Sequence, residues 1–530
     1  MASDSTQTTA TTGPPAPTQT QDHKEMFRAP VNRAMRVLDR SFFRKIVPLS
    51  AATVFENSQI SKTKNILTQS GDLLIAERTM PVRLTPEVGV GGKDGATPRK
   101  EEKPDRKMGT GDQRKKCLLL DAKVKYDDTT TWSPTIQELV AAKTVELGPY
   151  NLELDYDYFS YYDIISSILP EENMEEAPVS FTQVGHVAHV NLRDKHLPYK
   201  TLLAEILKDK NPSVETVINK VEVVGSQSEF RTFPYEVLAG DGNMNVTVRE
   251  QDCEFKFDYS KVYWNSRLQT EHLRLGEKFN EGEAVCDVMA GVGPFAIPAG
   301  KKRVFVCAND LNPHGYDSMV YAAKRNKVRE FVKPFKMDGR EFIRHASDEL
   351  RTRPLTVKIQ PTVSPQDAKK QRKQNQSLQQ HRKSSRSPSP KGRLSAPPEA
   401  EDITTLTRPQ TFDHFVMNLP ATAIEFLDAF IGVYAGQESL FYPFTDRKLP
   451  MIHVYCFSTH SDDVHNEHVD ICNRISERLG FTISPEDHVG GSGNAGRELE
   501  IYNVRLVAPN KQMFCASFRL PTQVAFAERP

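Results

Sequence analysis

The second half of the chain alternates short apolar stretches with longer amphipathic ones. From residue 284 onward, apolar runs that fit buried strands are followed by stretches whose apolar residues recur at helical spacing. This alternation is typical of a parallel sheet with crossover helices. We expect strands at residues 284–289, 303–309, 331–337, 412–417 and 451–457, and helices ending near residues 326 and 479. Two further strands, at residues 498–506 and 512–520, flank a turn at Pro509 and predict an antiparallel end to the sheet.

The region upstream has a mixed pattern that predicts smaller α+β structure. We expect a helix at residues 196–208 and strands at residues 184–192, 214–224 and 255–263. Residues 26–45 carry six basic residues, one acidic residue and apolar spacing close to helical. We interpret this stretch as the first helix of the folded domain, since amphipathic helices usually face a core. A chain started at Met26 would also look like a mitochondrial presequence, and this alternative stays open.

Three stretches lack the apolar residues needed to bury a core. They are a tail at residues 1–25, a Gly-, Pro- and charge-rich insertion at 87–116 and a basic insertion at 360–410. The centre of the last, residues 369–393, has nine basic residues and no acidic one, so it either adds RNA affinity or is a solvated insertion without a role. These boundaries predict an N-terminal domain at 26–178, a linking α+β domain at 179–262 and an α/β domain at 263–530.

Composition narrows the class of protein. The 530 residues include 69 basic and 69 acidic ones, which excludes a uniformly basic nucleic-acid coat but not a local basic patch. The apolar runs are too short to span a bilayer, so we expect no membrane association. Seven widely spaced cysteines without a CxxC pair predict free thiols and no metal site.

The main chemical motif, DVMAGVGPF at residues 287–295, follows the first strand of the α/β domain. Glycines at a strand-to-helix turn let the backbone approach a ligand, and the helix start offers free N–H groups. Asp310, 17 residues beyond Gly293, ends the second strand, where an acid can bind ribose hydroxyls. The pattern also fits NAD(P), and each acid could instead cap a helix. Asp287, Asp338 and Asn418 at the neighbouring strand ends favour S-adenosylmethionine.

At this level of detail the sequence closely resembles the tRNA (guanine(37)-N(1))-methyltransferases of eukaryotes and archaea. The resemblance starts near residue 28 and is carried by GHVAHVNLR at 185–193, EVLAG at 236–240, YWNSRL at 263–268, the glycine motif, DLNP at 310–313 and NLP at 418–420. It implies a Rossmann-like class I methyltransferase sheet preceded by smaller α+β RNA-recognition domains. It also implies methyl transfer from S-adenosylmethionine to N1 of the guanosine 3′ of the anticodon, which supports reading-frame maintenance.

The resemblance assigns three residues to catalysis. Guanine N1 carries a proton at neutral pH, so its methylation needs a base and a cation that stabilises charge on the neighbouring oxygen. Glu271 matches the segment that holds the base, Arg231 matches the stabilising arginine, and Asn418 is expected beside the methyl donor. Without the resemblance, Glu271 could be a surface helix acid and Arg231 could pair with Glu236.

The resemblance also implies the cofactor contacts. The methionine end is expected near the glycine loop, the ribose near Asp310 and the adenine near Asp338. The residues that we expect to bind S-adenosylmethionine are His272, Tyr263, Asp287, Gly291, Gly293, Asp310, Leu311, Asp338, Gly339 and Asn418.

The implied partner is a tRNA with guanosine 3′ of the anticodon, bound by a monomeric enzyme. The target base must be flipped out of its stack, and the N-terminal domain is expected to recognise the tRNA body. Family members are found in cytoplasm, nucleus and mitochondrial matrix, and we expect the same locations here. The alternatives are the related wybutosine-pathway aminocarboxypropyltransferase, a non-catalytic RNA-binding protein and, more remotely, a dehydrogenase.

Overall fold

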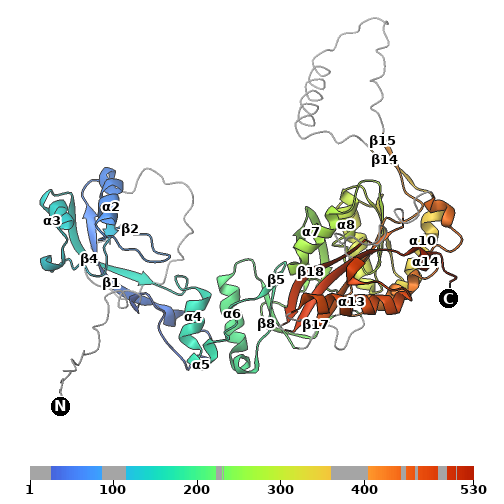
Figure 1. Ribbon diagram of the computed structural model, residues 1–530. Coiled ribbons are helices and arrows are strands. Elements are labelled where there is room, and N and C mark those ends of the chain that lie inside the picture. The colour runs from blue at the N-terminus through green and yellow to red at the C-terminus, as the bar shows by residue number, and fades with distance from the viewer. Residues whose placement is uncertain are drawn as a thin grey trace, which may run out of the picture. The chain divides into compact units, whose positions relative to one another are not determined.

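The computed structural model describes residues 25–85, 115–221, 230, 232–359, 404–442, 449–459, 463–487, 498–508 and 510–529. Most of the three stretches expected to lack a core, and Arg231, lie outside these residues. The chain divides into two compact units, Met1–Ser180 with Leu192–Pro212 and Phe181–Asn191 with Ser213–Pro530 (Figure 1). Residues 192–212, which the sequence pattern places in the linking domain, therefore group with the first unit.

The first unit is built on a four-stranded antiparallel sheet in the order β2-β3-β1-β4. Its long central pair, β1 (Lys45–Val54) and β4 (Val145–Leu154), is joined by β3 (Lys116–Leu119) and β2 (Val82–Leu84). Helices α2 (Ile60–Gln69) and α3 (Pro134–Ala141) pack close to this sheet. A second cluster holds α4 (Tyr161–Ile168), α5 (Glu171–Met174), η4 (Asp194–Tyr199) and α6 (Lys200–Lys210). The helix expected at 196–208 is thus a 3-10 helix up to residue 199 and an α-helix from residue 200.

The helix expected at residues 26–45 is wrong. After the helical residues Glu25 and Met26, the stretch forms one short 3-10 turn, η1 (Arg40–Phe43), before β1 begins. Tertiary contacts hold this stretch instead: Met35 and Phe43 are buried in the core, and the Arg33 guanidinium donates to the carbonyl oxygens of Ser166 and Leu169. The apolar residues of this stretch are thus spaced so that they reach the core from an irregular backbone, and their spacing does not indicate a helix.

The second unit begins with a small sheet in the order β5-β6-β7-β8. The single strand expected at 184–192 is wrong, because β5 (Thr182–Val184) and β6 (Val187–Val190) form a hairpin. Gly185 makes the turn at φ +58°, and a Cβ there would lie 2.9 Å from the Cβ of Val246. The strands that follow are β7 (Thr216–Lys220), β8 (Tyr235–Ala239), β9 (Asn245–Glu250) and β10 (Cys253–Asp258).

The main sheet has seven strands in the order β13-β12-β11-β16-β17-β19-β18. The first five are parallel, and β19 runs antiparallel to both of its neighbours, which confirms the expected α/β fold with an antiparallel end. The strand order reverses between β11 and β16, where ligands bind in open α/β sheets. The strands are β11 (Ala284–Asp287), β12 (Phe305–Asn309), β13 (Val332–Phe335), β16 (His414–Met417), β17 (Met451–Thr459), β18 (Leu499–Ala508) and β19 (Lys511–Arg519).

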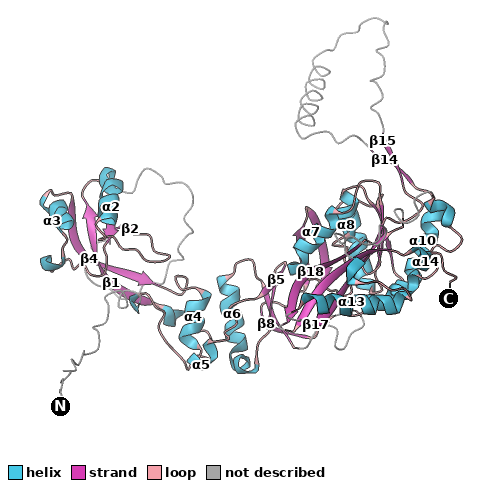
Figure 2. Cartoon of the chain, in the orientation of Figure 1, coloured by secondary structure: helices cyan, strands magenta, loops and turns pink. Residues whose placement is uncertain are grey.

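Alternate residues of these strands enter two separate cores, one on each face of the sheet. Cys286 and Phe415 belong to one core, whereas Val285 and Val416 belong to the other. The first core is closed by α10 (Gly339–Thr352), η6 (Ala423–Phe430) and α13 (Val464–Leu479), and the second by α7 (Gln269–Glu277), α8 (Ala296–Lys301) and α9 (Pro313–Arg325) (Figure 2). The remaining short helices are η2 (Asn57–Gln59), η3 (Thr129–Thr131), η5 (Ser266–Leu268), η7 (Glu438–Phe441), η8 (Pro485–Asp487) and α14 (Thr522–Ala525).

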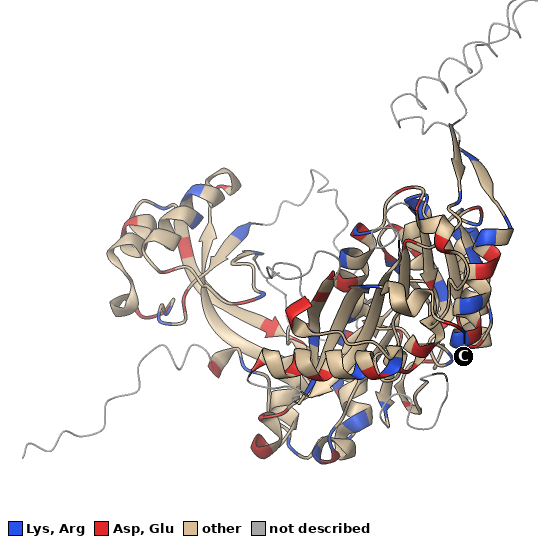
Figure 3. Cartoon of the chain, turned by 45° about the vertical axis from the view of Figure 1, so that its right-hand side comes forward, with Lys and Arg blue, Asp and Glu red and all other residues tan. Residues whose placement is uncertain are grey.

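One hairpin stands outside the main sheet. Strands β14 (Thr356–Ile359) and β15 (Thr404–Thr407) pair antiparallel, with Ile359 opposite Thr404. Basic and acidic residues are interspersed within each unit (Figure 3), in line with the balanced charge of the sequence. Within the described residues, no helix combines the length and apolar character needed to cross a membrane.

Candidate functional site

A cleft lies where β11, β12, β13 and β16 end. Its lining comes from the loops that follow these strands and from Phe230, residues 262–265, Leu268 and His272. The cleft contains nearly all of the expected cofactor residues, namely Tyr263, His272, Gly291, Asp310, Leu311, Asp338, Gly339 and Asn418. The structure thus brings together residues that are spread over 156 positions of sequence between Tyr263 and Asn418.

The glycine loop after β11 is braced by Asp310. The Gly291 N–H donates to Asp310 Oδ2 at 2.7 Å, and the Asn312 N–H donates to Asp310 Oδ1 at 3.0 Å. Gly291 and Gly293 have φ values of +58° and +92°, and a Cβ on Gly293 would lie 2.9 Å from Ile297. Glycine is therefore required at Gly293 by both backbone conformation and space. Burial raises the pKa of Asp310, and the two backbone donors oppose that shift.

Asp287 ends β11 without a hydrogen-bond partner among the described residues. It is fully buried, and both carboxylate oxygens lack a donor. Desolvation, with a smaller contribution from Asp310, raises its pKa well above the usual range. Asp287 does not itself line the cleft, although the next residues, Val288 to Val292, do. A buried carboxylate without donors is unfavourable unless a cation is supplied, so it fits the ammonium group of an amino-acid ligand.

Asp338 also caps a helix. It precedes α10, and its Oδ1 accepts from the backbone N–H of Arg340 at 2.8 Å and of Glu341 at 3.3 Å. The capping interpretation is thus confirmed for Asp338, and its contact with adenine remains a prediction. The neighbouring Gly339 leaves room for the ring of Phe426, whose nearest atom would lie 3.0 Å from an added Cβ.

Two residues of the site were not expected from the sequence. The Asn309 side chain donates to Val288 O and Met337 O and accepts from Met337 N–H, so it joins three strand ends. Glu250, on β9, lies 2.6 Å from His272 Nδ1, and both side chains are buried. Asn309 could have been found from the sequence, because it is a polar residue at the end of a buried strand. The contact between Glu250 and His272 joins segments that no local sequence pattern connects.

Glu271 is buried behind the cleft and does not line it. Arg274 donates to both of its carboxylate oxygens, each at 2.7 Å, and the Tyr455 hydroxyl donates to Oε1 at 2.7 Å. The alternative of a surface helix acid is therefore wrong. Among the described residues, no group of His, Cys, Asp and Glu could hold a metal ion.

Comparison with known proteins decides the family. A fungal tRNA (guanine(37)-N(1))-methyltransferase from Aspergillus fumigatus is 59% identical over 509 residues, which cover 96% of this chain and 97% of that protein. The chain belongs to the tRNA (guanine(37)-N(1))-methyltransferase family. A more distant relative with the same name, from Schizosaccharomyces pombe, is 45% identical over 413 residues and covers 78% of this chain and 84% of its own length.

Matches to domain families and solved structures agree with this family. Residues 161–243 match the TYW2 N-terminal domain, and residues 246–352 match the TRM5/TYW2 methyltransferase domain. Trm5b from Pyrococcus abyssi has a TM-score of 0.50 at 19% identity and covers 89% of this chain and 99% of its own. The complex of aTrm5 and tRNALeu has a TM-score of 0.52 at 17% identity, with 89% and 100% covered. At such identities these structures show the shared fold.

Proposed function

We propose that this enzyme transfers a methyl group from S-adenosylmethionine to N1 of guanosine 37 in tRNA. The observation that carries the proposal is the cleft at the reversal of strand order, which gathers the cofactor residues of a tRNA (guanine(37)-N(1))-methyltransferase. We propose that the first unit and the small sheet before β11 each contribute contacts to tRNA recognition.

The chain's own residues suit this cofactor. Asp287 would hold its ammonium group, Asp310 its ribose hydroxyls and Asp338 its adenine amine. Gly291 lines the cleft and leaves open space for the cofactor, whereas Gly293 does not line the cleft and lets the loop pack against Ile297. When bound, S-adenosylmethionine supplies a methyl group already activated by a sulfonium. His272 and Tyr263 also line the cleft, and Glu250 fixes the His272 ring.

Three residues are proposed to act on the guanine. Glu271 removes the N1 proton, Arg231 stabilises charge on the neighbouring oxygen, and Asn418 lies beside the methyl donor. Arg231 lies outside the described residues. Helix α7 directs His272 into the cleft and places Glu271 next to it in sequence. The base role requires the Glu271 carboxylate to turn from Arg274 and Tyr455 toward the bound guanine.

The basic residues that follow β6 are partly neutralised. Arg193 and Lys195 both pair with Glu176, the second at 2.8 Å. A phosphate at this position would have to replace Glu176 as their partner. We propose that a monomer binds the tRNA and that Arg193 and Lys195 then exchange the Glu176 carboxylate for a tRNA phosphate.

The reaction is tested with two tRNA transcripts that differ at one position. We expect label from S-adenosylmethionine to enter an unmodified transcript with guanosine 3′ of the anticodon and to be recovered as 1-methylguanosine. A matched transcript with adenosine at that position is expected to remain unlabelled. Product mass separates the two transferases of this fold, because an aminocarboxypropyl group is much heavier than a methyl group. Label in neither transcript despite cofactor binding contradicts the proposal.

We also propose that the enzyme acts in cytoplasm, nucleus and mitochondrial matrix. The support is the basic stretch after Met26, which has the composition of a presequence. With a C-terminal tag, Met26→Ala is expected to deplete a mitochondrial pool while leaving the cytoplasmic pool unchanged, as judged by fractionation. Met80→Ala, at an exposed methionine, is the control. An unchanged mitochondrial pool in Met26→Ala would reject the alternative start.

A further inference from the structure

A continuous file of polar side chains leads from Glu271 through the core to the edge of the second unit. Tyr455 and His453 lie on β17, and Cys515 and Ser517 lie opposite them on β19. The polar file, as defined here, consists of Tyr455, Cys515, Ser517, His453, His414 and Glu283. All members except Glu283 are buried, and the Glu283 side chain is 26% exposed.

Neighbouring members of the polar file either lie within hydrogen-bond or ion-pair distance or face each other across paired strands. The Tyr455 hydroxyl donates to Glu271 Oε1 at 2.7 Å, and Tyr455 lies directly opposite Cys515 in the β17–β19 pair. Cys515 Sγ lies 3.7 Å from Ser517 Oγ, which lies 2.8 Å from His453 Nδ1. His453 Nε2 lies 3.0 Å from His414 Nδ1, and His414 Nε2 lies 3.4 Å from Glu283 Oε2.

The two contacts of Glu271 differ in what they can do with a proton. Arg274 stays protonated at any physiological pH, so it cannot accept the proton that the base has removed. Tyr455 can accept a proton on its oxygen while it gives up its own hydrogen on the other side. While guanine occupies the cleft, Glu271 can therefore pass the proton to Tyr455 inside the protein.

We propose that the polar file carries the proton removed from guanine N1 to solvent at Glu283. The proposal rests on the role of Glu271 as the base. Once it has taken the proton, Glu271 turns back to Tyr455 and gives the proton to the Tyr455 oxygen as the Tyr455 hydrogen passes to Cys515 Sγ. The thiol hydrogen then passes to Ser517 Oγ, and the serine hydrogen to His453 Nδ1. Finally, His453 Nε2–H passes to His414 Nδ1, and His414 Nε2–H passes through Glu283 to water. Each group ends with as many protons as it had, and one proton leaves per methyl group transferred.

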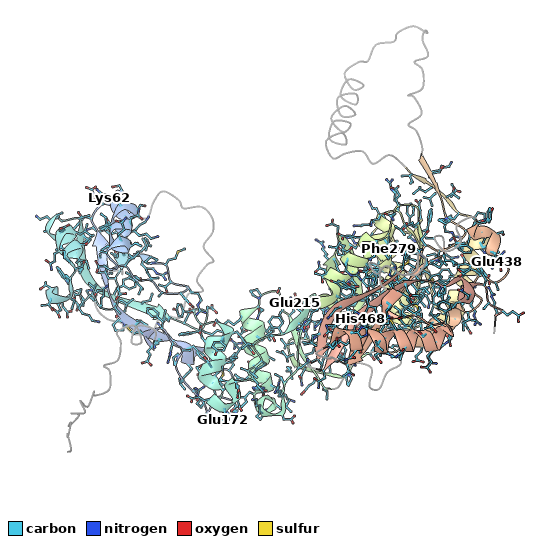
Figure 4. The ribbon with its side chains drawn as sticks, in the orientation of Figure 1. Lys62, Glu172, Glu215, Phe279, Glu438 and His468 are labelled. Atoms are coloured by element: carbon cyan, nitrogen blue, oxygen red, sulfur yellow. The ribbon has the colours of Figure 1, made fainter. Side chains whose placement is uncertain are left out.

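The surroundings of the histidine pair suit such a transfer. Phe279, labelled in Figure 4, is fully buried in the second unit. Its ring centroid lies 5.0 Å from that of His414 and 6.4 Å from that of His453, so its ring shields the pair from water. Burial, followed by His414, lowers the pKa of His453 well below its usual range, so this ring is neutral and has one donor and one acceptor nitrogen. The cations that also lower this pKa are Lys278, Arg274 and Arg519.

The experiment follows the proton and the methyl group in the same single turnover. Stopped-flow with a pH indicator in weak buffer reports proton release, and rapid quench reports 1-methylguanosine in tRNA. In the unsubstituted enzyme we expect the proton to appear with methyl transfer, before the tRNA dissociates. Cys515→Ala removes one link and is expected to delay proton release relative to methyl transfer, by about tenfold or more, until product release opens the cleft.

Cys515→Ser is the matched control, because a hydroxyl restores the link in a similar volume; it is expected to release the proton together with methylation. His453→Gln breaks the polar file at a second point and is expected to give the same delay, and thermal unfolding of each variant shows that it is folded. Proton release that accompanies methylation in both Cys515→Ala and His453→Gln overturns the relay, and so does release from the unsubstituted enzyme that waits for tRNA dissociation. Absence of methyl transfer in the unsubstituted enzyme contradicts the proposed function instead.

Discussion

Glutamine at Glu271 is expected to slow methyl transfer by about 10²–10⁴-fold, which is the range that general-base catalysis contributes. The amide has nearly the shape of the carboxylate but cannot accept the N1 proton. The Glu271 carboxylate is hydrogen-bonded to Arg274 and Tyr455 and is not one of the proposed cofactor contacts, so the affinity for S-adenosylmethionine is expected to stay unchanged. Single-turnover methyl transfer to tRNA and calorimetric titration of the cofactor measure the two effects separately.

A matched substitution controls for the loss of negative charge beside Arg274. Glu500 lies 3.8 Å from the same guanidinium and 36% of its side chain is exposed. Glu500→Gln is therefore expected to change methyl transfer little. Wild-type rates in Glu271→Gln would show that another group takes the proton, and His272, which lines the cleft with Glu250 as its partner, would be the next candidate.

Asparagine at Asp287 is expected to weaken cofactor binding and to stabilise the free protein. The lost charge-assisted contact with the ammonium group is worth roughly 1.5–3 kcal/mol, or about ten- to hundredfold in Kd. In the free protein, a buried carboxylate without donors costs roughly 1–3 kcal/mol, and the neutral amide reduces this cost. Calorimetric titration is expected to show a higher Kd for S-adenosylmethionine. Urea unfolding without the cofactor is expected to show a higher free energy of unfolding.

The gain in stability is expected to depend on pH in a defined direction. The pKa of Asp287 is raised in the folded state, so the ionised carboxylate destabilises the folded protein at pH values above that pKa. This destabilisation disappears as the pH falls through the raised pKa toward 3.8, the ordinary value. The stability difference between Asp287→Asn and the unsubstituted protein should therefore shrink at acidic pH. Asp413, whose pKa is also raised by burial, accepts from the Ala284 N–H at 2.8 Å and is the control. Equal stabilisation by Asp413→Asn would argue against the missing donor as the cause.

The main sheet could be predicted because its strands are short, apolar and buried on both faces. Such strands, like β11 and β12, are visible as runs between helical stretches, and the acid or asparagine at each end marks the cleft. The first unit was harder, because β1 and β4 lie about 100 residues apart in sequence and their pairing leaves no local signal. The turn at Gly185 was missed because the apolar residues continue on both sides of it.

In the site, too, some features have a local sequence signal and others depend on contacts between distant segments. Residues of the strand-end loops were predicted in place, since the topology alone brings them together. The burial of Glu271 under Tyr455 and the contact of Glu250 with His272 depend on how α7 packs against β17 and β9, which the sequence pattern does not specify. Contacts between distant elements are thus the part of this site that required the structure.

The pairing of β14 with β15 separates the catalytic sheet from the stretch that interrupts it. Ile359 lies opposite Thr404, so the residues on either side of the segment 360–403 are held next to each other. The entropy of closing a loop changes slowly with its length once its ends are held together. The hairpin is therefore a site that tolerates insertions and deletions. Residues can be added or removed there, or replaced by a reporter domain, while the register of the seven strands of the main sheet is kept.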